Sequence, residues 1–434
     1  MSNTIDEVFG LNRDITLNYV TRDGVDKKFI ESLFLNQHVV IYSSAKQGKT
    51  SLRKKYLGDA DCIVVSCQNT WTLVELHASI LKEAGFDVGQ SAEKTASGAV
   101  KLVARAAEAP IQAENSDEAG FGRQRTSPEK QFWHALELDP NDPNDIINAL
   151  REIAFDRLIV LEDFHYLPDD TQKTFAFALK IFHEKSRITF IIIGAWREEN
   201  RLVGLNGDLI NRVISIDVDT WKYESINELI DAGAYLLNVT IDEVFRRELL
   251  RWSFGSIHIV REACRRVCRV SGLNETHSDR KPRNIGSTVD ASSIVAQIAS
   301  EQSGRYRRFL TEFANVFQTE FEMPKWIIYA ILCSSLAQLK DGLPLRRISA
   351  IIRAKHPKRK DLSNAHIIHD LSAVSSLQIK LGMRPLVVDY DAARTSLDII
   401  DKAFLIWLAI QNIRELMDDL GLPEPLDSKV LETI

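Results

Sequence analysis

Residues 38–50 read His38-Val-Val-Ile-Tyr-Ser-Ser-Ala-Lys-Gln-Gly-Lys-Thr50, an apolar run followed by a short polar loop. The loop resembles the phosphate-binding pattern G-x-x-x-x-G-K-[ST], except that Ser43 stands in place of the first glycine. A strand, a tight loop and a following helix would aim backbone N–H groups and a positive helix end at phosphates. Lys49 is placed to reach the β- and γ-phosphates, and the Thr50 hydroxyl to hold Mg²⁺. The predicted nucleotide contacts are Ser44, Ala45, Lys46, Gln47, Gly48, Lys49, Thr50 and Ser51.

A second apolar run, residues 157–161, ends in Glu162 and Asp163. A run that is apolar on both faces predicts a central parallel strand, and ligands bind at the carboxyl ends of such strands. Paired carboxylates there are suited to bind Mg²⁺ and to orient or deprotonate an attacking water. Glu162 occupies the metal-binding position by register, but the order Glu-Asp leaves both assignments open. The alternative is an acidic strand end that caps the next helix.

Two further strand patterns, at 188–193 and 214–218, are accompanied by Arg197 and Arg212. Together with the loop at 43–50, the strand at 62–69 and the acidic strand end, this order resembles the core of an AAA+ ATPase. The resemblance is to the origin-recognition or initiator-type and the STAND-type members of that family. It implies an α/β fold with a P-loop parallel-sheet core, ATP or ADP with Mg²⁺ as cofactors, and ATP hydrolysis.

The same resemblance implies roles for residues outside the loop. Arg197 would sense the γ-phosphate, and Arg212 would serve a neighbouring subunit as an arginine finger. His258 stands where the family's lid carries a nucleotide-contacting arginine, with Arg261 one turn further on as the alternative, so slow or regulated hydrolysis is expected. Residues 19–22 would lie beside the adenine. The competing interpretations are a solvated helix-end cation for Arg212 and a structural histidine for His258.

Length and composition support a soluble protein of several domains. The 434 residues predict two or three domains, and 45% hydrophobic with 26% charged residues are typical of globular proteins. The net charge of −6 allows only local basic patches. Five cysteines without a C-x-x-C pair predict a reduced, cytoplasmic protein. Because neither a signal peptide nor about 18 consecutive apolar residues occur, no membrane association is expected.

The chain is predicted to divide into three parts. Residues 1–220 would form the nucleotide-binding core, residues 221–286 a helical lid, and residues 287–434 a winged-helix domain with flanking helices. From about 87 to 131 the core carries a stretch rich in Ala, Ser, Glu, Gln and Gly. This composition predicts a mobile insertion with partial helix at about 99–108.

The last part shows helical patterns at 325–333, 344–353 and 364–374, then alternating runs at 377–380 and 385–390. Helices followed by a hairpin resemble the winged helix-turn-helix of initiator-type ATPases. A basic cluster at 340–360 is the footprint of phosphate contacts, whereas the third helix carries no arginine. Duplex DNA contacted through residues 340–390 is therefore one interpretation, and protein docking is the other.

Two functions from different classes fit these patterns. The first is an ATP-gated switch that assembles with copies of itself or with a partner effector, of the signalling, mobile-element or antiphage-defence type. The second is an initiator-like protein that uses ATP to fix a DNA-binding conformation through its winged helix. Self-assembly on ATP without DNA favours the first, and salt-dependent retention of duplex DNA favours the second.

Overall fold

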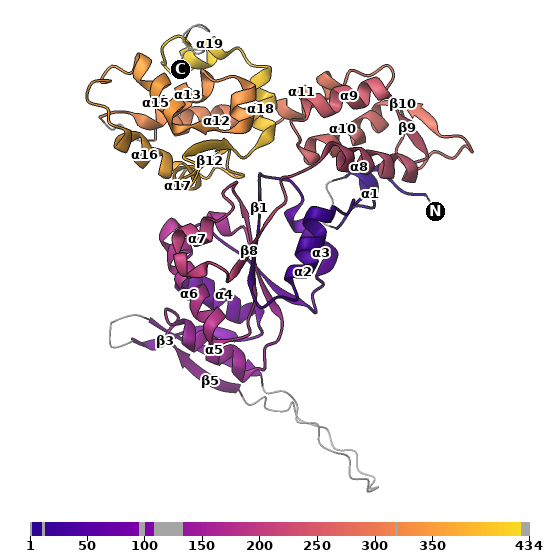
Figure 1. Cartoon of the computed structure of the whole chain (residues 1–434). Helices are drawn as coiled ribbons and strands as arrows, with labels where there is room; N and C mark the ends of the chain where they lie inside the picture. The colour runs from indigo at the N-terminus through magenta and orange to yellow at the C-terminus, as the bar shows by residue number, and fades with distance from the viewer. Residues whose placement is uncertain (1, 11–13, 95–99, 108–132, 317–319, 427–434) are drawn as a thin grey trace.

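A computed structural model of the whole chain describes residues 2–10, 14–94, 100–107, 133–316 and 320–426. Figure 1 shows three bodies, with the core at the bottom and two helical bodies side by side above it. The middle of the chain, residues 223–300, forms a unit that we call the lid, and residues 303–426 form what we call the C-terminal unit. Within the described residues, no helix combines the length and apolarity needed to cross a membrane.

The core is built on a five-stranded parallel sheet in the order β2-β6-β7-β1-β8. All five strands predicted for the core are present, and their bounds are β1 His38–Ser43, β2 Cys62–Ser66, β6 Leu158–Glu162, β7 Phe190–Ala195 and β8 Val213–Asp217. Strand β7 lies between the loop-bearing β1 and the acidic β6.

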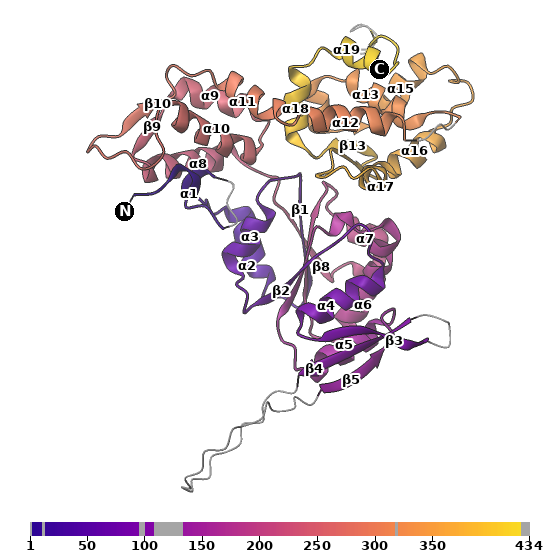
Figure 2. The same ribbon diagram turned by 180° about the vertical axis from the view of Figure 1, so that it is seen from behind.

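Helices cover both faces of this sheet, which explains why its strands are apolar throughout (Figure 2). Val39 and Ile41 of β1 pack with the helices on one face, and Val40 and Tyr42 pack with those on the other. The first face carries α2 Lys28–Ser32 and α3 Lys49–Tyr56. The second carries α4 Leu73–Glu83, α5 Pro143–Glu152, α6 Asp169–Lys185 and α7 Arg201–Leu205.

The insertion in the core differs from the prediction. Strands β3 Asp87–Lys94, β4 Val100–Ala107 and β5 Trp133–Leu138 form a separate antiparallel sheet at the far end of the core. The expected helix at 99–108 is therefore wrong over its described residues. Leu102 and Ala104 are buried while Arg105 is exposed, so pairing with β5 overrides the helical preference of an alanine-rich segment. Residues 95–99 and 108–131 of the predicted mobile insertion lie outside the described residues.

The segment that we call the lid is mostly helical. Its elements are α8 Tyr223–Leu236, β9 Val239–Ile241, α9 Glu243–Trp252, α10 Ile257–Val270, β10 Arg283–Ile285 and α11 Ala291–Ser300. The N-terminal helix α1, Ile5–Phe9, packs against α8 and α10 rather than against the core. Strand β10 pairs in parallel with β9 and so belongs to the same unit.

The C-terminal unit combines helices with a three-stranded antiparallel sheet in the order β11-β13-β12. The strands are β11 Leu343–Pro344, β12 Val388–Asp391 and β13 Ser396–Ile399. The helices are α12 Ser303–Ala314, α13 Met323–Leu332, α14 Leu336–Asp341, α15 Leu345–Lys355, α16 Asn364–Ser372, α17 Val374–Lys380, α18 Lys402–Ala409 and α19 Ile413–Asp419.

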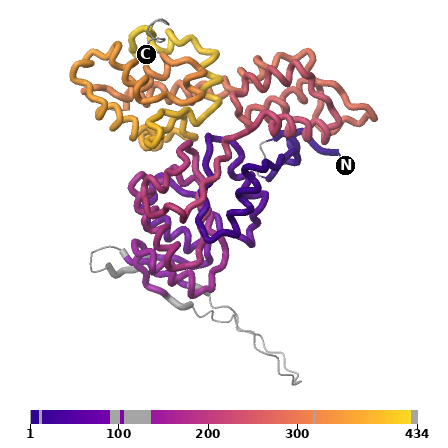
Figure 3. Tube along the Cα trace, viewed as in Figure 1, coloured from indigo at the N-terminus to yellow at the C-terminus, as the bar shows by residue number. Residues whose placement is uncertain are grey.

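One strand predicted for this unit is wrong, because residues 377–380 belong to helix α17. Buried Leu371, Val374 and Leu377 recur at helical spacing, and a four-residue alternating run cannot compete with that longer pattern. The partner of β12 is instead β13, which begins at Ser396. Helix α11 packs against α9, α10 and α18, and the lid and the C-terminal unit lie side by side (Figure 3). Their buried apolar residues form one continuous cluster.

Candidate functional site: a cavity over the phosphate-binding loop

The loop after β1 adopts a strained, tightly turned backbone. Lys46 and Gly48 both have positive φ, at 59° and 95°, and α3 begins at the next residue, Lys49. Glycine takes this left-handed conformation readily, whereas Lys46 does so at a cost of about 1–2 kcal/mol. Glycine therefore occupies one of the two positions with positive φ. At the other position, contacts with surrounding residues keep Lys46 in its left-handed conformation.

A cavity of about 690 Å³ lies over this loop, a volume within the usual range for small-molecule sites. Residues 45–51 form its floor, and the remaining walls come from the carboxyl ends of β6 and β7, from α10 of the lid, and from the C-terminal unit. The wall residues are Asp14, Asp163, His165, Tyr166, Ala195, Ile257, His258, Arg261, Arg384 and Pro385.

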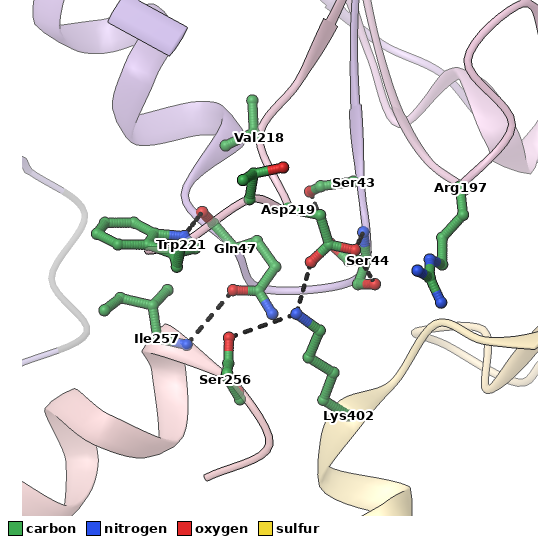
Figure 4. Close-up of polar contacts among 12 residues, drawn as sticks. Ser43, Ser44, Gln47, Arg197, Val218, Asp219, Trp221, Ser256, Ile257 and Lys402 are labelled. Carbon is green, nitrogen blue, oxygen red and sulfur yellow. Dashed lines mark hydrogen bonds and ion pairs between the residues drawn. The ribbon is translucent and has the colours of Figure 1, made fainter. Parts of the chain in front are cut away.

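Gln47 ties the loop to the lid (Figure 4). Its side-chain oxygen accepts a hydrogen bond from the backbone N–H of Ile257, the first residue of α10, at 3.3 Å. Its backbone carbonyl accepts a second one from the Trp221 indole N–H at 3.3 Å. The indole of Trp221 also supports the guanidinium of Arg22, 4.1 Å away. A movement of the loop would therefore be passed directly to the start of α10.

The C-terminal unit contacts the same loop from the other side. The N–H of Ala45 donates to the carbonyl of Ile400 at 2.8 Å. Lys402 forms an ion pair of 2.7 Å with Asp219, and Asp219 in turn accepts hydrogen bonds from the N–H and the hydroxyl of Ser44. Lys402 also donates to the carbonyl of Gly255 in the lid, at 3.3 Å. Lys402 thus joins the core, the lid and the C-terminal unit.

Lys49 lies in the cavity floor and is bonded to the loop itself. Its ammonium donates to the hydroxyl and the carbonyl of Ser43, at 2.9 and 3.2 Å, and to the Ser44 carbonyl at 2.8 Å. Burial lowers the pKa of Lys49 to about 8, although Asp219 and Asp163 favour its charged form. Ser43, which departs from the loop pattern, thereby supplies a ligand to the lysine that a glycine would lack.

The two predicted carboxylates face different surroundings. Glu162 forms an ion pair of 2.9 Å with Arg53 of α3, and both side chains are largely buried. Asp163, whose φ is 58°, lines the cavity. Burial and the neighbouring Glu162 raise the pKa of Asp163, while Lys49 and Arg384 act in the opposite direction. Of the pair, Asp163 is the one placed to reach a bound ligand.

The predicted arginines of the core lie outside the cavity wall. Arg197 donates to the carbonyl of Lys340 at 3.2 Å and lies 3.6 Å from the Asp398 carboxylate, both in the C-terminal unit. Arg212 pairs with Glu184 at 2.8 Å and precedes β8, at the end of the sheet opposite the loop. Neither arginine reaches the cavity of its own chain.

The lid contributes His258 and Arg261. Burial, together with Lys46, lowers the pKa of His258 to about 4, so this imidazole is neutral at physiological pH. Burial lowers the pKa of Arg261 to about 10, and its guanidinium donates to the carbonyl of Gly10. Among the described residues, neither His258 Nδ1 nor Arg261 Nε has a hydrogen-bond partner. A partly buried cation without a paired carboxylate is suited to bind an anion.

Several residues of this site were not singled out from the sequence. His165 follows the acidic pair in the same stretch, so its position beyond β6 was a usable signal. Arg384 and Lys402 gave no such signal, because only the packing of the C-terminal unit brings them to the loop. Residues 19–22, expected beside the adenine, do not line the cavity, whereas Asp14 does.

The donor set fits a nucleotide with Mg²⁺. Lys46, Lys49, Arg261 and Arg384 face the cavity against only two carboxylates among the described wall residues, Asp14 and Asp163. Magnesium is usually held by one or two protein groups together with phosphate oxygens. The described residues contain no group of three or more His, Cys, Asp or Glu that could hold a metal ion. Thr50 and Asp163 are the wall residues that could bind the ion.

Comparison with known proteins adds the fold. The Walker-type ATPase PABY2304 of Pyrococcus abyssi matches with a TM-score of 0.53 at 13% identity, over 93% of this chain and 100% of that chain. The chain has the fold of a P-loop ATPase. This likeness confirms the predicted α/β P-loop class, and at such low identity it shows the fold alone.

Two more distant structures also match. The Aeropyrum pernix ORC1 protein in complex with DNA has a TM-score of 0.43 at 10% identity, over 96% of this chain and 97% of that chain. The Thermotoga maritima RuvB Holliday junction branch migration motor has a TM-score of 0.34 at 11% identity, with 93% and 92% covered. Neither likeness is close enough to carry an argument. No family model matches the sequence, and a search of curated proteins finds no match.

Proposed function

We propose that the chain is an ATP-binding, slowly hydrolysing AAA+ switch that assembles with itself or with a partner effector. The observation that carries the proposal is the set of contacts made by the phosphate-binding loop. Within three residues, the loop bonds to the lid through Gln47 and to the C-terminal unit through Ala45. A phosphate that reorders this loop would therefore shift the lid and the C-terminal unit relative to the core.

In this proposal the charge of each cavity residue determines what it binds. Lys49 and Arg261 hold the phosphates, and the neutral His258 offers a hydrogen bond in place of the arginine found in relatives. When bound, Mg²⁺ would neutralise phosphate charge, held by Thr50 and Asp163. Slow turnover is expected because Glu162 is held by Arg53 and Arg197 by the C-terminal unit, so two candidate catalytic groups are engaged elsewhere.

Assembly would bring a residue from a second copy to the site. Arg212 is partly exposed at the opposite end of the sheet, where it would be presented to a neighbouring subunit as an arginine finger. The effector would be of the signalling, mobile-element or antiphage-defence type. The five cysteines are free and buried, in keeping with the cytoplasmic location that we propose.

DNA binding is the second candidate function. The order of helices and strands from α13 to β13 supports a winged helix. A specific observation favours nucleic acid: basic side chains on α15 and the following loop are exposed, namely Arg346, Lys355, Lys358, Arg359 and Lys360. Of these, Lys358 is paired with Glu320 at 3.1 Å.

Binding of a fluorescent ATP analogue tests the proposal. Lys49→Ala is expected to abolish binding, because it removes the cation in the cavity floor, whereas the exposed Lys360→Ala serves as the matched control. Light scattering on adding ATP without DNA should then show assembly, and Arg212→Ala should lower only the assembly-dependent ATPase rate. Failure of the wild-type chain to bind the analogue would refute the proposal. ATP-driven retention of duplex DNA without self-assembly would favour the second function.

A further inference from the structure

Arg384 brings a positive charge from the C-terminal unit to the nucleotide cavity. It lies between α17 and β12, and together with Pro385 it forms part of the cavity wall. Its guanidinium carbon lies 4.4 Å from the ring centroid of Tyr166, another wall residue that follows the acidic strand β6. The salt bridges found among the described residues do not include Arg384, so none of their carboxylates is paired with it.

The backbone that carries Arg384 is fixed by buried contacts. The carbonyl of Pro385 accepts a hydrogen bond of 2.8 Å from Arg305, and Arg305 also pairs with Asp401 at 2.7 Å. Leu386 packs with Tyr166, Ile379 and Ile400 in a small apolar cluster between the core and the C-terminal unit. The segment therefore needs no ordering when a ligand arrives, which lowers the cost of binding.

The positive charge of Arg384 acts on the end of the cavity that contains Asp163. Its charge acts on Asp163 and His165, the same two residues on which the charge of Lys49 acts. A guanidinium stacked on an aromatic ring still exposes its N–H edge, which matches phosphate oxygens in a bidentate manner. Arg384 and Lys49 thus approach the same end of the cavity from opposite domains.

We propose that Arg384 binds the terminal phosphates of the nucleotide held by its own chain, so that the C-terminal unit itself reads the phosphate chain. The inference rests on the proposed nucleotide-binding function and adds a contact residue to it. Unlike an arginine supplied by a neighbouring subunit, Arg384 needs no assembly to act. Loss of the terminal phosphate would remove one of the bonds that keep the C-terminal unit against the loop.

Competition binding of ATP, ADP and AMP against a fluorescent analogue tests this role. Arg384→Ala is expected to weaken ATP binding by about tenfold, the loss of one charge-assisted contact at a partly exposed site. AMP, which lacks the terminal phosphates, should bind the variant and the wild-type chain equally. Arg384→Lys should recover part of the loss. Arg414→Ala, at an exposed arginine of α19 in the same unit, should leave all three affinities unchanged.

A purely structural role would give a different result. Hydrogen exchange without nucleotide should show the same protection of residues 43–48 in Arg384→Ala as in the wild-type chain. Faster exchange there, an equal loss for ATP and AMP, or an unchanged ATP affinity would each overturn the assignment of Arg384. In those outcomes Lys49→Ala would still abolish binding and the proposed function would stand. A wild-type chain that binds no nucleotide would overturn both.

Discussion

Glu162 and Asp163 show how two adjacent carboxylates acquire different surroundings. Glu162 points to Arg53 on α3, whereas Asp163, in a left-handed backbone conformation, lines the cavity. The sequence predicted an acidic pair at the carboxyl end of a buried strand, and that placement follows from the strand pattern alone. The direction of each side chain does not, because it depends on the turn after β6 and on Arg53, far away in sequence.

Amide substitutions are expected to distinguish the roles of Glu162 and Asp163. Asp163→Asn should leave ATP binding largely intact and lower the hydrolysis rate by at least about tenfold, because an amide is a weaker ligand for Mg²⁺ than the carboxylate that it replaces. Glu162→Gln should instead destabilise the fold by about 1–3 kcal/mol, since it leaves the buried Arg53 without its counter-ion. ATPase assays and thermal unfolding of both variants check this. An inactive Glu162→Gln beside a fully active Asp163→Asn would contradict it.

The lowered pKa of Lys49 makes nucleotide binding depend on pH. With its pKa at about 8, roughly half of the free chains carry a neutral Lys49 at pH 8. Phosphate favours the charged form, so the complex binds more protons than the free protein. Affinity is therefore expected to fall, by up to about tenfold per pH unit, as pH rises above 8. Calorimetry at pH 8 in buffers of different ionisation enthalpy should show uptake of about half a proton. A nucleotide affinity that does not change between pH 7 and pH 9 would contradict this pKa.

At the scale of elements, the parallel sheet was predictable and the insertion was not. A run such as residues 188–193 is apolar on both faces, and its length and its β-branched residues favour a buried strand. The segment around Leu102 has helix-forming residues, and its strand conformation depends on pairing with β5 some thirty residues later. Likewise, α17 was read as a strand because four residues are too few to distinguish the two periodicities.

The end of β7 offers a test of packing at this scale. Any side chain at Gly194 would overlap the indole of Trp196, which is fully buried against α6 and α7. Gly194→Ala is therefore expected to lower the free energy of unfolding by about 1–3 kcal/mol. Gly204→Ala, in the exposed part of α7, is the matched control, where a methyl group meets only ordinary contacts. Chemical denaturation of the two variants measures the difference, and equal stability would contradict the packing described for β7.

At the scale of the whole molecule, the docking of the C-terminal unit is the feature that the sequence could not reveal. Charged pairs such as Arg201 with Asp389, at 3.1 Å, cross from the core to the unit. Their partners are nearly two hundred residues apart, and each residue by itself reads as an ordinary surface charge. The predicted parts at 1–220, 221–286 and 287–434 divide the chain along its sequence. They do not indicate that the third part contacts the phosphate-binding loop of the first.

Loss of the Lys402 ion pair should loosen this docking. Lys402→Ala leaves the partly buried Asp219 without its cation, and we expect docking to weaken by about 1–3 kcal/mol. The Ala45 amide, protected through the Ile400 carbonyl, should then exchange its hydrogen about 10- to 100-fold faster. Exchange of the peptide covering residues 43–48 measures this, with Lys360→Ala as control. Unchanged protection would mean that the loop is not held by the C-terminal unit.

The central claim is that one cavity, walled by the core, the lid and the C-terminal unit, holds a nucleoside triphosphate. The most direct measurement is a crystal structure of the chain with Mg²⁺ and a non-hydrolysable ATP analogue. We expect the phosphates over residues 45–50, with Lys49 turned from the Ser43 and Ser44 carbonyls toward them. Arg261 and Arg384 should contact the phosphates, and Thr50 and Asp163 should bind the metal ion. An analogue bound elsewhere, or a cavity without nucleotide at saturating concentration, would contradict the account.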